Sequence, residues 1–126
     1  MEILSPGEAL SRLKQLIKNG KHGVNYTFVP TDKNRLLVET YYLDDKKRIE
    51  ILLSLEESDY IKDEYSYDPD NPDDYMYVFI KRNVILMPRF FEEAEFERLD
   101  IYVKFYFGND KNSFAVILSI HKAGDY

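Results

Sequence analysis

The sequence contains no cysteine and no tryptophan, and it has no long apolar run. Without cysteine, disulfides and thiolate metal sites are excluded. No apolar run reaches the ~18 residues of a membrane span, and the N-terminus lacks the basic and then apolar layout of a secretory signal. We therefore expect a cytoplasmic protein with no membrane partner. Glycine-rich phosphate loops, nucleophile elbows and cysteine–histidine pairs are also missing, which excludes the commonest nucleotide-binding and nucleophilic motifs.

The length of 126 residues suffices for one domain with a single hydrophobic core, and we expect one domain over residues 1–126. A net charge of −6 disfavours general affinity for nucleic acid. The charge is uneven, because residues 41–80 sum to about −8 whereas residues 1–40 sum to about +2. The acidity is therefore local, and neither end of the chain is acidic.

The N-terminal half carries the start signals of helices. Ser5 is a suitable N-cap, with Glu8 at the third helical position, and an apolar stripe follows that consists of Leu10, Leu13, Leu16 and Ile17. A short extended run covers residues 24–29. Two further helices are expected. One covers about 33–42 after the capping residues 31–32, and the other follows the capping residues 43–45 and runs through Leu53.

The middle of the chain is less regular. Residues 63–74 are rich in Asp, Tyr and Pro, and we expect an exposed loop there. This loop resembles a calcium-binding loop only faintly, because it lacks the central glycine and the terminal glutamate at the required spacing. Residues 75–82 predict a strand. Residues 84–98 are interrupted by Pro88 and show no clear pattern. Residues 90–97 fit a short helix or a hairpin equally badly, and both interpretations stay open.

Two C-terminal segments alternate with period two, which is typical of strands. In Leu99–Phe107 one face carries Leu99, Ile101, Val103, Phe105 and Phe107. In Ser113–His121 the expected apolar face carries Phe114, Val116, Leu118 and Ile120. Residues 108–112 form a turn by composition. Helices first and antiparallel strands last predict an α+β fold, with N-terminal helices packed on a mainly antiparallel sheet.

The apolar pattern also predicts a polar cluster. A register slip of one residue would exchange core and surface side chains, so only registers that join the two apolar faces bury a continuous core. Those registers bring Tyr102 and Lys104 next to Ser119 and His121 on the other face of the sheet. An apolar packing constraint thus predicts a group of titratable side chains on one sheet surface.

This cluster has the chemistry needed for RNA cleavage. Imidazole titrates near neutral pH, and a lone histidine near a C-terminus is otherwise most often a surface residue. Cleavage of an RNA phosphodiester needs a base for the 2′-hydroxyl, cations for the phosphate and an acid for the leaving oxygen. These roles can be supplied without a metal or cofactor by His121, Tyr102, Lys104 and Lys62. The second histidine, His22, lies in a polar turn and is expected to be solvated.

Basic residues elsewhere are candidate phosphate contacts. Lys14, Lys18 and Lys21 recur on one face of the first predicted helix, either as a solvated stripe or as a phosphate-binding one. The candidate RNA-binding residues are Lys14, Lys18, Lys81 and Arg82.

Several segments together resemble a known family. Residues 9–20 are similar to the opening helix of the MqsR (motility quorum-sensing regulator) toxins, and residues 51–62 carry a similar Leu-x-x-x-Asp-Tyr-x-Lys segment. Residues 75–81 occupy the place of an aromatic-rich strand in that family. Residues 101–104, Ile-Tyr-Val-Lys, and residues 116–121, Val-Ile-Leu-Ser-Ile-His, resemble its last two strands. The resemblance covers most of residues 9–122.

The resemblance implies a RelE-like fold and a metal-independent endoribonuclease that cleaves mRNA. It also implies the toxin component of a type II toxin–antitoxin system, neutralised by a cognate antitoxin with a zinc ribbon and a helix-turn-helix. The family's catalytic positions fall on Lys62, Tyr102 and His121, with Lys104 at a second strand lysine.

Two alternative interpretations stay open. The chain departs from the family pattern by lacking a glutamine in residues 75–79, and acidic residues fill part of segment 84–98. Together with the acidic stretch 63–74, these features would suit a basic partner. The first alternative is therefore a non-catalytic interaction protein of the same fold that binds a basic or DNA-binding protein. The second is a small interaction domain of a phage or mobile element, without catalytic chemistry.

Overall fold

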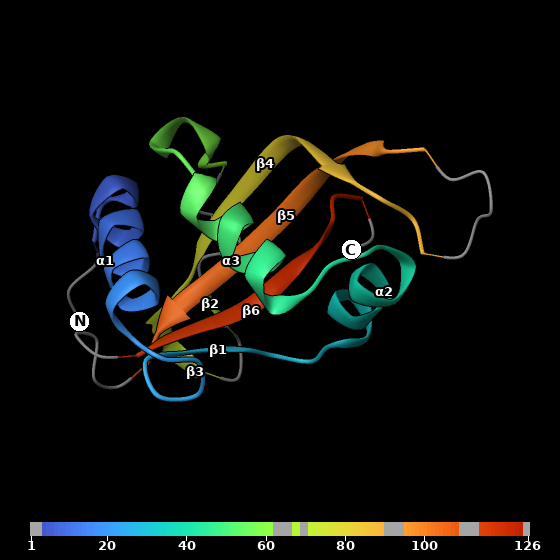
Figure 1. Cartoon of the computed structure of the whole chain (residues 1–126). Coiled ribbons are helices and arrows are strands. Elements are labelled where there is room, and N and C mark those ends of the chain that lie inside the picture. Colours follow the sequence, from blue (N-terminus) through green and yellow to red (C-terminus); the bar gives the residue numbers. More distant parts are fainter. Residues whose placement is uncertain (1–3, 62–66, 69–70, 90–94, 109–113, 125–126) are drawn as a thin grey trace.

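The computed structural model of the chain describes residues 4–61, 67–68, 71–89, 95–108 and 114–124 (Figure 1). The helices are α1 (Pro6–Asn19), α2 (Asp32–Thr40) and α3 (Asp45–Ser54), followed by a short 3₁₀ turn, η1 (Glu57–Asp59). The strands are β1 (Tyr26–Phe28), β2 (Tyr67–Asp68), β3 (Asn71–Tyr75), β4 (Tyr77–Leu86), β5 (Glu97–Phe107) and β6 (Ala115–Lys122).

The main sheet has four strands in the order β1-β6-β5-β4. The pairs β4–β5 and β5–β6 are antiparallel, and the short β1 runs parallel to β6. Figure 1 shows α1 and α3 on the near face of this sheet and α2 at the sheet edge that carries β1, where it contacts β6. The predicted α+β fold, with helices packed on a mainly antiparallel sheet, is confirmed.

Each helix begins at a side chain that accepts a hydrogen bond from a backbone amide, as the sequence predicts. The Ser5 hydroxyl accepts from the Glu8 amide, and the Glu8 carboxylate accepts in turn from the Ser5 amide. Thr31 and Asp44 cap α2 and α3 in the same way. These bonds satisfy amides that have no partner inside a helix, which is why the chain turns helical at these positions.

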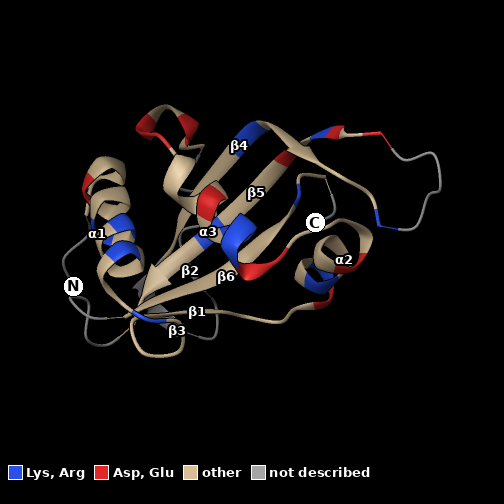
Figure 2. Ribbon diagram, in the orientation of Figure 1, with Lys and Arg blue, Asp and Glu red and all other residues tan. Residues whose placement is uncertain are grey.

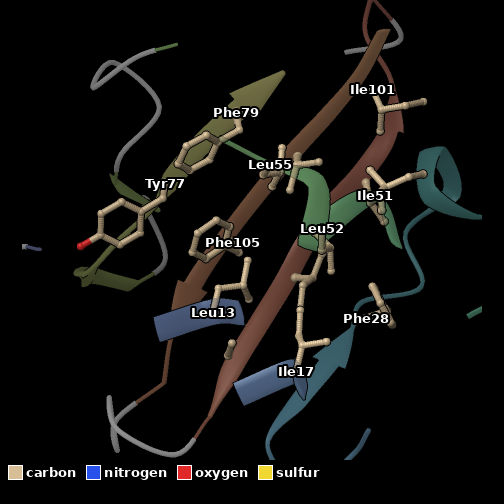
Figure 3. Close-up of a cluster of buried hydrophobic side chains, with 14 of the residues drawn as sticks. Leu13, Ile17, Phe28, Ile51, Leu52, Leu55, Tyr77, Phe79, Ile101 and Phe105 are labelled. Atoms are coloured by element: carbon tan, nitrogen blue, oxygen red, sulfur yellow. The ribbon is translucent and has the colours of Figure 1, made fainter. Parts of the chain in front are cut away.

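The hydrophobic core lies between the helices and the sheet (Figure 3). On the sheet side, the predicted alternation of β5 is confirmed, since Ile101, Val103 and Phe105 are fully buried. The Phe105 ring stacks on Phe79 of β4, with centroids 5.8 Å apart. The helical layer contributes Leu10, Leu13, Ile17, Leu37, Ile51, Leu52 and Leu55. Burial of these apolar surfaces is the main force that holds the two layers together.

The predicted apolar face of β6 is wrong over most of its length. Ala115 and Ile117 are the buried residues and join the core, whereas Phe114, Val116 and Leu118 are only partly buried. The cause is a β-bulge, because Lys104 pairs with Ser119 but Phe105 pairs with Ile117. Leu118 is the extra residue, and it shifts the alternation by one position. The odd-numbered residues Ala115 and Ile117 face the core before the bulge, and the even-numbered Ile120 faces it after the bulge.

The middle of the chain also departs from expectation. Part of the predicted loop 63–74 forms an antiparallel two-stranded sheet, β2–β3. A hairpin of this kind satisfies backbone groups between its own strands, and apolar side chains are not required for those bonds. The predicted strand 75–82 instead begins at Tyr77 and continues to Leu86, across a bulge at Arg82 and Asn83. Residues 84–86 pair with residues 97–99 where β4 ends and β5 begins. Residues 90–94 lie outside the described residues, so the helix and hairpin alternatives for residues 90–97 both stay open.

Candidate functional site

The predicted polar cluster forms on the face of the sheet opposite the helices. Tyr102 pairs directly with His121, and Lys104 pairs directly with Ser119. Directly paired residues of antiparallel strands project to the same side, so these four side chains share one surface. That surface lies opposite the core, since Val103 and Ile120, the paired residues next to Tyr102 and His121, both belong to the core. The predicted face of this cluster is therefore confirmed.

The centre of the cluster is a stacked pair of rings. The centroids of Tyr102 and His121 lie 5.1 Å apart, with 19° between the ring planes. His121 Nδ1 lies 3.0 Å from the backbone carbonyl oxygen of Lys122. Because a carbonyl oxygen only accepts, Nδ1 donates its proton in this bond.

The two rings are buried: His121 is 3% exposed and Tyr102 is 6% exposed. Lys104 is half-buried beside them. Partial removal from water strengthens the interaction of charged and polar groups with one another. It also means that the stacked rings contribute to the packing of this sheet face, whatever else they do.

A side chain from α2 holds the strand that carries His121. The buried amide of Asn34 donates to the carbonyl oxygens of Leu118 and Val29, at 3.0 and 2.8 Å. Its oxygen accepts from the Ile120 amide at 2.9 Å. At this edge β6 has no strand partner beyond Ile117, and the Asn34 amide satisfies the backbone groups on either side of the bulge.

Sequence reasoning missed Asn34 as a positioning residue. The signal that could have identified it is its spacing from Leu37, which lies three positions later and therefore on the same side of the helix. Asn34 and Leu37 are both buried. A buried amide needs hydrogen-bond partners, so it points to backbone groups that must also be satisfied.

Several predicted RNA contacts make internal interactions. Lys14 Nζ donates to the Leu55 carbonyl oxygen at 2.6 Å, and Lys81 Nζ donates to that of Ser54 at 2.9 Å. Both ammonium groups therefore lie at the C-terminal end of α3, where the helix dipole favours a positive charge.

The remaining predicted residues have different positions. Arg82 forms an ion pair with Asp100 at 3.3 Å, across the β4 bulge. Lys18 is exposed in the last turn of α1. His22 is 44% exposed in its side chain and stacks on Tyr26, away from the cluster around His121. Lys62 lies outside the described residues, so its predicted role stays a prediction.

No group of three His, Asp or Glu side chains that could hold a metal ion occurs among the described residues. The helices of this part of the chain are also too short and too polar to cross a membrane.

Comparisons with known proteins do not assign this α+β chain to a family. No protein-family model, no curated protein and no solved structure matches the chain significantly. The resemblance to the MqsR family thus stays a prediction, and the function must be argued from the residues of this chain.

Proposed function

We propose that this protein is a metal-independent endoribonuclease that cleaves mRNA, acting as the toxin of a type II toxin–antitoxin system. The single observation that carries the proposal is the pairing of Tyr102 with His121 and of Lys104 with Ser119 on one sheet face. That pairing places the side chains of a histidine, a tyrosine and a lysine on one face of two adjacent strands. The site of action would be the cytoplasm, where mRNA is present.

The proposed reaction is transfer of the RNA phosphodiester to its own 2′-oxygen. His121 Nε2 accepts the proton of the 2′-hydroxyl, and the 2′-oxygen forms a bond to phosphorus. The bond from phosphorus to the 5′-oxygen breaks, and that oxygen takes a proton from an acid. The products are a 2′,3′-cyclic phosphate and a 5′-hydroxyl, so no oxidant, metal or cofactor enters the balance.

The neighbouring residues have separate roles in this proposal. The Lys104 ammonium group stabilises the negative charge that builds on the phosphoryl oxygens. The Tyr102 ring orients the imidazole by stacking on it, and its hydroxyl is the candidate acid. Lys62 is retained as a second cation on the strength of the family resemblance alone.

A second candidate function is non-catalytic binding of a protein partner. It is favoured by the low exposure of His121 and Tyr102, because RNA must reach a catalytic imidazole directly. It is also favoured by the internal contacts of Lys14 and Lys81, since phosphate neutralisation by basic residues dominates affinity for nucleic acid. The partner in this case would be a basic or DNA-binding protein.

Cleavage of a long RNA in the presence of EDTA separates the two candidates. For the nuclease, we expect defined cut sites with cyclic phosphate ends, and loss of cleavage in His121→Ala. Lys122→Ala is the matched control, because Lys122 is the exposed neighbour in the same strand. Circular dichroism of each variant checks that it is folded. Intact RNA with the folded wild-type protein contradicts the nuclease and leaves the binding protein.

Co-expression tests the toxin role separately. We expect growth arrest on expression of the wild-type chain, relief by His121→Ala, and relief by a co-expressed antitoxin from a neighbouring reading frame. Growth arrest that persists in a folded but cleavage-deficient His121→Ala protein would show that toxicity does not come from RNA cleavage.

A further inference from the structure

A second surface combines an aromatic ring with positive charges. An open groove of about 360 Å³ lies between the segment that follows α2, the first turns of α3 and the residue Arg89. Tyr42, Lys46, Lys47 and Arg89 line it, together with acidic Asp44 and Glu50. We call it the Tyr42–Arg89 groove. Figure 2 shows basic residues directly after the acidic start of α3.

The Tyr42 ring is exposed but held in place. The residue is 60% exposed, which is unusual for a large aromatic side chain. Its backbone amide donates to the Met87 carbonyl oxygen at 2.8 Å, and its hydroxyl donates to the Arg89 carbonyl oxygen at 3.4 Å. A ring fixed in this way loses little conformational freedom when a ligand stacks on it.

Arg89 is anchored next to this ring. Its Nε donates to the carbonyl oxygens of Val38 and Tyr41, and its backbone amide donates to that of Thr40. The guanidinium carbon lies 5.2 Å from the centroid of the Tyr42 ring. Among the described residues, no hydrogen bond or ion pair occupies the terminal guanidinium nitrogens, which therefore remain able to donate to a ligand.

The acidic residues of the groove have structural roles. Asp44 caps α3 by accepting from the Lys47 amide, and Glu50 lies 3.6 Å from the Lys47 ammonium group. Lys46 is exposed. The groove therefore offers Arg89 and Lys46 to an anion, in contrast to the lysines that lie at the C-terminal end of α3.

We propose that the Tyr42–Arg89 groove binds single-stranded RNA by stacking one unpaired base on Tyr42, with the adjacent phosphates close to Arg89 and Lys46. An exposed aromatic ring flanked by cations is the arrangement that single-stranded nucleic acids recognise, because every base has a π-face. The choice of RNA as ligand rests on the proposed function. An acidic protein segment would use the cations but has no base to stack on Tyr42.

The test measures binding of a fluorescent, single-stranded 2′-O-methyl RNA by fluorescence anisotropy. This RNA has no free 2′-hydroxyl and cannot be cut by the proposed reaction, so binding is measured apart from cleavage. We expect Tyr42→Ala to weaken binding about 10-fold or more. Tyr42→Phe should retain most of the binding, because the ring that stacks is kept and only the hydroxyl bond to Arg89 is lost. Lys46→Ala should lower the slope of log affinity against log salt concentration by about 0.7.

Phe96→Ala is the matched control. Phe96 is a 68% exposed aromatic residue between Glu95 and Glu97, without cations beside it in sequence. We expect its removal to leave RNA binding unchanged. An equal loss in Phe96→Ala and Tyr42→Ala would show nonspecific stacking and would overturn the assignment.

Three further outcomes would overturn the proposal: no RNA binding by the wild type, equal binding of an abasic oligomer, or unchanged binding in Tyr42→Ala. Tyr42-independent competition by poly-glutamate would point to an acidic protein partner. Failure of RNA cleavage with intact, Tyr42-dependent binding would contradict only the nuclease. Loss of binding with intact cleavage of unmodified RNA would contradict only the groove.

Discussion

Two pairs of side chains, Tyr102 with His121 and Tyr42 with Arg89, lie in contrasting regions of the molecule. Tyr102 and His121 stack on the sheet face and are 6% and 3% exposed. The Arg89 guanidinium group lies over the Tyr42 ring at the groove beside α3, where Tyr42 is 60% exposed. The first pair is placed by direct strand pairing, and the second by hydrogen bonds between two short irregular segments.

The two regions differ in what their rings contribute, which is stability of the fold in one and contact with a ligand in the other. A ring buried in a sheet contributes packing and hydrogen bonds, so its removal costs free energy of folding. A ring that is mostly exposed contributes little to the free energy of folding. It can therefore contact a ligand, and its substitution should destabilise the fold only slightly. The proposed chemistry therefore lies in the region where substitutions also destabilise the fold, and the proposed base-binding ring lies where they do not.

The largest effect is expected from a substitution that destroys the strand pairing of the sheet. Val103 is fully buried on the core face, one residue from Tyr102. We expect Val103→Asp to cost more than about 4 kcal/mol and to abolish cooperative thermal unfolding, because it buries an unpaired charge. Val24→Asp is the control, since Val24 is 66% exposed, and it should change stability by less than about 0.5 kcal/mol. A cooperative transition in Val103→Asp would contradict the register.

Asn34→Ala tests what holds the bulge beside His121. We expect a loss of about 1–3 kcal/mol for each buried backbone group left without its partner, measured by urea unfolding. Shifted NMR signals of the His121 ring would report the altered strand, with those of His22 as an internal reference. Lys33→Ala, at the exposed neighbouring position, should leave both readouts unchanged. Unchanged stability in Asn34→Ala would show that water replaces the amide.

The two pairs are compared directly by removing the His121 ring from one and the Tyr42 ring from the other. We expect His121→Ala to lower the free energy of unfolding by about 1–3 kcal/mol, through lost packing and hydrogen bonding. Tyr42→Ala should lower it by no more than about 0.5 kcal/mol. Urea unfolding of both variants under the same conditions gives the result. Equal losses would remove the distinction between the two regions.

The smallest effect is expected at the start of α1, where the capping hydrogen bonds between Ser5 and Glu8 are exposed. The hydrogen bond with the Ser5 side chain, and then that with the Ser5 amide, lower the pKa of the Glu8 carboxyl, and Arg12 adds to the shift. A carboxyl with a lowered pKa in the folded state stabilises the fold above its unfolded pKa, and this is lost as the pH falls through the lowered value.

Glu8→Gln provides the measurement for this helix start. Above about pH 4.3 we expect the variant to be slightly less stable than the wild type, and the difference in melting temperature should shrink on acidification. The sheet pairing should not change in this variant. A difference that grows as the pH falls would contradict the cap as the origin of the shift.

Much of the cluster around His121 could be predicted because it follows from local alternation. The face of Tyr102 and Lys104 was determined by the apolar residues between them, and the pairing partners were correct. The bulge at Leu118 could not be predicted, because its backbone groups are satisfied by Asn34, a residue 84 positions away. The alternation therefore held on one side of the bulge and failed on the other.

The roles of the basic residues were not predictable for a similar reason. A lysine stripe on a helix has the same pattern whether the ammonium groups face solvent or a helix terminus. Lys14 and Lys81 donate to adjacent carbonyl oxygens of α3 because tertiary packing brings α1 and β4 to that end. Likewise, Tyr42 and Arg89 are separated by 47 positions, and no periodicity connects them.

The sequence by itself determined the elements that depend on near neighbours: the capped helices, the strands of the C-terminal hairpin and the α+β class. Capping and alternation act over a few residues, so their energies can be assigned without the fold. Only the tertiary structure decided which charges are used internally, where β6 changes face and which aromatic rings remain exposed. These outcomes depend on hydrogen bonds and burial between distant segments, because a buried polar group must find its partner wherever the fold supplies one.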